Sequence, residues 1–172
     1  MKKIYLFAFG LFYLTFASAQ INVTYNWTAN KIKYGVVPGL QIGTSNASQV
    51  VWSDPDEGIT FQIIAQPNAG YESAKEIANA HWERLIADEL TIRSTSGDYY
   101  ETGGYYVHSI QGDGWQNGKH VYFFVNGYYD PAGTYHAIGE VLYYMNNEDQ
   151  EYNSSMNSKA ITLLSAIERI ED

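Results

Sequence analysis

Histidine is the residue type in this 172-residue sequence that could support a metal site or acid–base catalysis. The four histidines are His81, His108, His120 and His136. No two of them have the three- or four-residue spacing that presents two ligands on one helix face. The last three fall on successive predicted strands, where neighbours converge, so a metal site of His108, His120 and His136 is one hypothesis. No carboxylate has ligand spacing beside them, which favours three unrelated histidines in the sheet and no bound cofactor. His81 lies on the apolar face of a predicted helix, so we expect a core residue with its hydrogen bonds satisfied.

Motifs for nucleophilic catalysis and phosphate binding are missing. The chain has no cysteine and no Gly-x-Ser-x-Gly elbow. Gly103-Gly104 and Gly112-x-Gly114 open no predicted helix, so neither is a phosphate loop. Asp54–Gly58 lacks the twelve-residue spacing of a calcium loop, and its Asp, Pro and Gly predict a turn. We therefore expect a non-catalytic protein. The alternative hypothesis is a small envelope hydrolase or metal-dependent enzyme centred on the strand histidines.

Aromatic residues offer contacts for a partner. Tyrosine doublets recur at Tyr99-Tyr100, Tyr105-Tyr106, Tyr128-Tyr129 and Tyr143-Tyr144. In a strand, each doublet places one ring on either face of the sheet, so some of these rings simply fill the sheet. Trp115 lies in a predicted glycine-rich turn over Asp113–Gly118, where an indole has little core to fill. The candidate partner contacts are Trp115, Asp113, Tyr128 and Tyr129, with the turn and the tyrosine pair at different ends of the strands.

Two helices are predicted to position these residues. Ser73 and Glu76 fit a capping box at the start of a helix over Ser73–Leu90. Apolar residues recur there at three- and four-residue steps, which makes one face that can lie on a sheet. A second apolar stripe predicts a helix over Ser154–Ile170.

The remaining segments have the pattern of strands. Before the first helix they are Ile21–Trp27, an edge-like strand within Ile32–Ile42, and a hairpin of Gln49–Ser53 with Ile59–Ala65. After it they are Thr91–Ser94, Tyr99–Thr102, Tyr105–Gln111, His120–Tyr129 and Thr134–Met145, with turns at Gly112–Gly114 and Asn117-Gly118. His120–Tyr129 is apolar or aromatic on both faces. The sequence therefore predicts an α+β fold, a three-layer α/β/α sandwich with a mainly antiparallel sheet and one helix on each face.

This order of elements resembles the PsbP-like fold, which includes photosystem PsbP subunits and the bacterial envelope protein DcrB. The resemblance covers about Ile32 to Ile170 and includes the phrases Asp56-Glu57-Gly58-Ile59 and Asp130-Pro131-Ala132-Gly133-Thr134-Tyr135. It implies assembly factors, adaptors and binding modules, several of them exported. It brings no shared catalytic residues.

The first nineteen residues have the three parts of a secretory signal peptide. Lys2 and Lys3 precede the apolar run Ile4–Phe16, and Ala17-Ser18-Ala19 is a small-residue cleavage site. We expect cleavage at Ala19-Gln20 and one domain over residues 20–172. The short lysine pair and the absence of cysteine favour a bacterial protein, either periplasmic or secreted.

The net charge of the chain limits the classes of partner that it can bind. Removing the signal peptide takes away two basic residues and no acidic ones, so the net charge moves from −9 to −11. A chain this acidic repels phosphate backbones and anionic lipid, which argues against nucleic acid and membrane partners. We expect another envelope protein as the partner; the oligomeric state is open.

Overall fold

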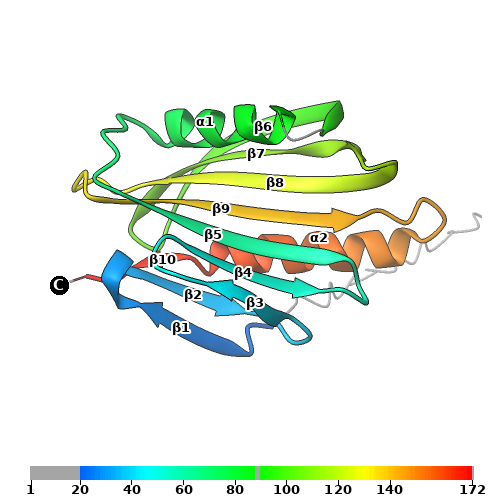
Figure 1. Cartoon of the computed structure of the whole chain (residues 1–172), viewed down its shortest axis with the longest axis horizontal. Coiled ribbons are helices and arrows are strands. Elements are labelled where there is room, and N and C mark those ends of the chain that lie inside the picture. The colour runs from blue at the N-terminus through cyan, green and yellow to red at the C-terminus, as the bar shows by residue number, and fades with distance from the viewer. Residues whose placement is uncertain (1–19, 88–89, 172) are drawn as a thin grey trace, which may run out of the picture.

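The computed structural model describes residues 20–87 and 90–171, in an order of strands, helix, strands and helix (Figure 1). The predicted signal peptide and residues 88–89 of the predicted first helix lie outside this range. The first half contains β1 (Val23–Trp27), the 3-10 turn η1 (Thr28–Asn30), β2 (Ile32–Val36), β3 (Gln41–Ser45), β4 (Gln49–Asp54), β5 (Ile59–Pro67) and α1 (Ala74–Ala87). The second half contains β6 (Thr91–Thr102), β7 (Tyr105–Gln116), β8 (Lys119–Tyr129), β9 (Tyr135–Tyr144), α2 (Gln150–Ser165) and β10 (Glu168–Arg169).

The strands form two antiparallel sheets. The large sheet has seven strands in the order β3-β4-β5-β9-β8-β7-β6, and the small one has three in the order β1-β2-β10. The α+β class predicted from the sequence is confirmed. The edge-like strand predicted within Ile32–Ile42 is instead two strands, because the chain leaves β2, turns at Gly39 with a φ of 94° and enters the other sheet as β3.

The two helices lie on opposite faces of the large sheet, as predicted. Alternate residues of β8 show this, because successive side chains of a strand point to opposite faces. Val125 packs with Ala78 of α1, and the Phe123 ring lies 4.9 Å from that of Trp82. On the other face, the Tyr128 hydroxyl donates to the Leu164 carbonyl oxygen of α2 at 2.7 Å. The small sheet shares this second face with α2.

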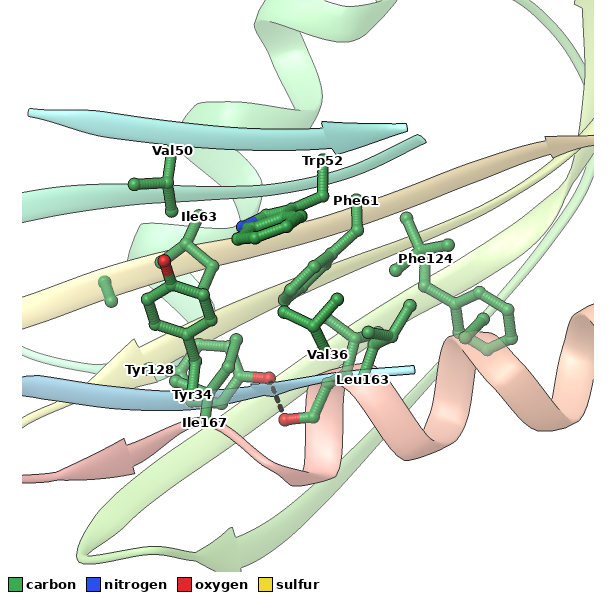
Figure 2. Packing of buried hydrophobic residues seen from close by; sticks show 14 of the residues in the cluster. Tyr34, Val36, Val50, Trp52, Phe61, Ile63, Phe124, Tyr128, Leu163 and Ile167 are labelled. Atoms are coloured by element: carbon green, nitrogen blue, oxygen red, sulfur yellow. Dashed lines mark hydrogen bonds between the residues drawn. The ribbon is translucent and has the colours of Figure 1, made fainter. Parts of the chain in front are cut away.

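Figure 2 shows the core between the large sheet, α2 and the small sheet. Tyr34 and Val36 of β2 pack there against Phe61 of β5, and Leu163 and Ile167 enter from the C-terminal part of the chain. All five side chains are at most 4% exposed. This core ties the first strands of the described chain to its last residues.

Both predicted helices exist, with corrected ends. In α1, the Ser73 Oγ accepts from the Glu76 amide at 3.2 Å as predicted, but the Glu76 carboxylate accepts from the Glu72 amide, not from that of Ser73. The range Ser154–Ile170 is wrong at both ends for α2. The helix begins earlier because the Asp149 side chain caps it by accepting from the Tyr152 amide at 2.8 Å. It ends at Ser165, and Glu168–Arg169 pairs with β2 instead.

The meander has fewer turns than predicted. The segments Thr91–Ser94 and Tyr99–Thr102 belong to one strand, β6, and β7 runs without a turn through Gly112–Gly114. These glycines allow close approach of strands: a Cβ at Gly112 would overlap the Ser94 carbonyl oxygen, and one at Gly114 would overlap that of Thr91. The hairpin turn is at Asn117-Gly118, which was also predicted.

Candidate functional site

The side chains of β6, β7 and β8 that point to the α2 side form an open polar surface, here called the polar face. It exists because α2 packs over β9, β5 and β2 and leaves most of the outer strands β6 and β7 uncovered on this side. Their ends near Thr102 and Val107 are covered by the C-terminal end of α2 and the core. Cross-strand register places its members on one face. They are Ser94, Ser96, Asp98, Tyr100, Ser109, Gln111, Asp113, Trp115, His120, Tyr122 and Asn126. Polar and aromatic types dominate, as expected for a sheet face that meets water.

Trp115 stands at one end of the polar face on a rigid support. It is the cross-strand neighbour of His120, and the two rings stack with centroids 5.0 Å apart and an angle of 17° between planes. The His120 Nε2 lies 2.8 Å from the Asp113 carboxylate, and its Nδ1 lies 2.9 Å from the Asn147 side chain. Trp115 is 46% exposed, whereas His120 is buried behind it. The histidine therefore fixes the indole in place and leaves much of it open to solvent.

Asp113 is the centre of this cluster. Its carboxylate accepts from the Ser94 hydroxyl and from His120, and Arg93 lies 3.6 Å away. Burial alone would raise the pKa of Asp113, but the hydrogen bonds from Ser94 and His120 and the charge of Arg93 outweigh it and hold the pKa below its usual value.

The Ser94–Asp113–His120 chain has the wrong order for nucleophilic catalysis. A catalytic serine hydroxyl donates to histidine, which the carboxylate orients from the other side. Here the Ser94 hydroxyl donates to Asp113, and both nitrogens of His120 already have partners. The geometry is suited to holding side chains in position.

A groove of about 190 Å³ lies farther along the polar face, against α2. Asp98, Ser109 and Asn126 form part of its floor, and Phe124, Ile161 and Leu164 form apolar walls. Asn126 donates to the Tyr100 hydroxyl at 2.6 Å and to that of Tyr128 at 3.2 Å. The groove and Trp115 therefore belong to one continuous surface of the sheet.

The four candidate contacts predicted from the sequence differ in exposure and position in the structure. Trp115 is exposed as expected, but it lies in strand β7 and not in a turn. Asp113 is beside it, with only 13% of its side chain exposed. Tyr128 is wrong as a surface contact, because it is fully buried and its hydroxyl bonds Leu164. Tyr129 is partly buried and stacks on His136 at the other end of β8.

The three strand histidines do not converge. His108 points to the α1 side, where its ring packs at a tilt of 38° on that of Tyr99, with centroids 4.3 Å apart. His120 is on the polar face and His136 lies by the β8–β9 turn, where it accepts from the Asp130 amide. Within residues 20–87 and 90–171, no three or more His, Asp or Glu side chains gather in a way that could hold a metal ion.

Sequence reasoning missed two features of the sheet. One is the cross-strand row of Asp98, Ser109 and Asn126, which depends on strand register. The other is a buried pair under α1, in which the His81 Nε2 lies 2.6 Å from the Glu140 carboxylate. His81 is the satisfied core histidine that its place on the apolar helix face predicted.

The sequence matches no protein-family model and no curated protein, but the fold has solved counterparts. The Ran-binding protein Mog1p of Saccharomyces cerevisiae superposes with a TM-score of 0.61 at 12% identity, over 88% of this chain and 97% of Mog1p. LpqN of Mycobacterium tuberculosis, described as involved in cell envelope biogenesis, superposes with a TM-score of 0.51 at 15% identity, over 80% of this chain and 82% of LpqN. A Bacteroides thetaiotaomicron protein superposes with a TM-score of 0.52 at 8% identity. The match covers 89% of this chain and 50% of the Bacteroides protein. The chain thus has an α/β sandwich fold related to theirs.

None of the helices in the described part of the chain is long and apolar enough to cross a membrane.

Proposed function

We propose that this protein is an exported, non-catalytic binding module of the bacterial envelope, and that its polar face contacts a protein partner with Trp115 as the anchor. The observation that supports this most is the state of Trp115, which is nearly half exposed yet held by the stack on His120. Aromatic anchors on rigid elements carry much of the affinity in protein interfaces, because little side-chain freedom is lost on binding.

The acidic character of the chain supports a partner with a positively charged surface. Long-range attraction raises the association rate more than the affinity. Asp113 is mostly enclosed by Ser94 and His120, so its role in this proposal is to position the ring behind Trp115.

Export, location and family are parts of the same proposal that rest on the sequence. They comprise a signal peptide at residues 1–19 cleaved at Ala19-Gln20, a single domain over 20–172, a periplasmic or secreted location and membership of the PsbP-like group. The roles of two structural counterparts are compatible with it, since Mog1p is a Ran-binding protein and LpqN is involved in cell envelope biogenesis.

The test is a pull-down from an envelope extract, followed by affinity measurement with the partner that it returns. Trp115→Ala should weaken binding by about 2 kcal/mol or more while the melting temperature hardly changes. Tyr106→Ala is a matched control, because Tyr106 has a similar exposure of 48% on the same strand but points to the opposite face. Equal effects of the two variants, or none for Trp115→Ala, would contradict the proposal. An enzymatic activity lost with His120→Gln would favour the hydrolase alternative.

A further inference from the structure

Three oxygen-bearing side chains form a straight row across the polar face. Asp98 of β6 pairs with Ser109 of β7, which pairs with Asn126 of β8, so all three point to the same side. Adjacent strands are about 4.8 Å apart, which places the Cα atoms of Asp98 and Asn126 about 10 Å apart with Ser109 between them. The next partner is Gly139 of β9, and Leu164 of α2 lies over it, 2.8 Å from where a Cβ would be. The row therefore runs from the open edge of the sheet to the wall made by α2.

The amide orientation of Asn126 leaves one acceptor without a partner. The Tyr128 hydroxyl uses its hydrogen on the Leu164 carbonyl oxygen, so it must accept from Asn126. This fixes Nδ2 toward the two tyrosines and Oδ1 away from them. Asn126 is 1% exposed, and its Oδ1 has no hydrogen-bond partner among the residues that the structure describes. A buried acceptor in this state is costly, and it gains stability from any donor that reaches it.

Asp98 supplies negative charge at the outer end of the row. Its side chain is exposed, and one of its oxygens accepts from the Tyr99 amide at 2.7 Å. Within the described residues no Lys, Arg or His side chain forms an ion pair with it. The groove therefore offers the Asp98 carboxylate and the Ser109 oxygen as acceptors, and the buried Asn126 Oδ1 lies at its inner end, where a donor reaches it only if the side chains around it shift.

The walls of the groove have the opposite character. Phe124 points toward α2, as Figure 2 shows. Ile161 and Leu164 of the helix line the same groove. Ile161 is 50% exposed, so apolar surface remains open here. A volume of about 190 Å³ suits one extended side chain or a small molecule. An apolar wall above an acceptor row fits a ligand with a hydrocarbon stem and a donor-only head.

From this arrangement we propose that the groove beside α2 binds an alkylammonium group, with its head over Ser109 between Asp98 and Asn126 and its stem along Phe124, Ile161 and Leu164. The ligand is either a free small amine or a lysine side chain of the partner protein. The second source rests on the function proposed above.

The first test is a titration of the ¹⁵N-labelled protein with n-butylammonium, followed by nuclear magnetic resonance. The Asn126 side-chain amide and the Ser109 backbone amide should shift in a saturable manner. Asp98→Asn should raise the dissociation constant about tenfold or more, because a charged hydrogen bond becomes a neutral one. The matched control Asp56→Asn removes an exposed charge from the β4–β5 turn and should leave the constant unchanged.

Two further probes separate head from stem. N-butylacetamide keeps the stem but has no charge, and methylammonium keeps the charge but has no stem. Both should bind more weakly than n-butylammonium. The proposal is wrong if N-butylacetamide binds equally well, if Asp98→Asn has no effect, or if the shifts spread over the surface without saturation.

The partner distinguishes the two sources. If acetylating the lysines of the partner weakens the complex with the wild-type protein but not with Asp98→Asn, the ligand is a lysine side chain. If acetylation has no effect and n-butylammonium still saturates, the ligand is a free amine. Failure of the two proposals is distinguishable, because loss of n-butylammonium binding overturns the amine site alone. An unchanged partner affinity in Trp115→Ala overturns the function alone.

Discussion

Two clusters at opposite ends of β8 use the same residue types for different purposes. At one end, Trp115 stacks on His120, which contacts Asp113. At the other end, Tyr129 stacks on His136 with centroids 4.9 Å apart, and His136 contacts the Asp130 backbone. Each cluster thus combines an aspartate, a histidine and an aromatic ring.

The partners of the aspartate make the difference. Asp130 is fully buried and accepts from the backbone amides of Ala132, Thr134 and Tyr135 and from Arg169. It closes the β8–β9 turn and ties the C-terminal segment to it. In the described part of the chain, the Asp113 carboxylate bonds only side chains, and the aromatic residue beside it is exposed. An aspartate that satisfies backbone amides stabilises the fold, whereas one that holds other side chains can present a surface.

The largest expected effect is on stability at the buried end. Asp130→Ala leaves three amides and the Arg169 guanidinium without their acceptor, so it should lower the free energy of unfolding by about 3–5 kcal/mol. Asp113→Ala should cost less, about 1–2 kcal/mol, because Ser94 and Arg93 are exposed and can turn to water, so that only the buried His120 loses a partner. Urea midpoints of the two variants measure this. Equal losses would mean that both clusters are structural.

The next effect is the dependence of stability on pH. Burial lowers the pKa of His136 and outweighs the attraction of Asp130. The unfolded chain, with a histidine pKa of about 6.5, therefore binds a proton that the folded chain does not. Stability should fall as pH drops below about 6.5, by at most about 1.4 kcal/mol per pH unit for this group.

His136→Gln should flatten that fall when urea midpoints are compared between pH 7.5 and pH 5. Part of the fall should remain, because burial lowers the pKa of His108 in the same direction. A slope that is unchanged in His136→Gln would show that this histidine titrates alike in the folded and unfolded chains.

Caps and apolar periodicity in the sequence predicted the helices and most strands, but they could not predict which side chains come together in the site. Ser73 and the apolar steps after it identify α1 because a cap and a period agree. The turn predicted at Gly112–Gly114 was wrong because a glycine is typical both of turns and of places where two strands approach closely. The neighbouring strand β6 determines which of the two applies, and its position is not visible in the local sequence. The row of Asp98, Ser109 and Asn126 needs the register set by two hairpin turns, and a slip of one residue would move each side chain to the other face.

The smallest effect tests how Asp113 contributes to the exposed end. Asp113→Asn keeps one acceptor oxygen where the carboxylate offers separate oxygens to Ser94 and His120, and it removes the charge. Charge-assisted bonds are about twice as strong as neutral ones. Because the pKa of Asp113 is lowered, its stabilising contribution is fully present above about pH 3.8 and is lost only as pH falls below that. At neutral pH the variant should therefore loosen His120 behind Trp115 and weaken partner binding by about 0.5–1 kcal/mol.

Calorimetric titration with the partner measures that loss of binding free energy, which is compared with the loss in Trp115→Ala. A loss as large as that of Trp115→Ala would mean that Asp113 contacts the partner directly, although only 13% of its side chain is exposed. No loss at all would mean that the stack of Trp115 on His120 holds the indole without help. The intermediate result is expected because Asp113 acts on the partner only through the two rings in front of it.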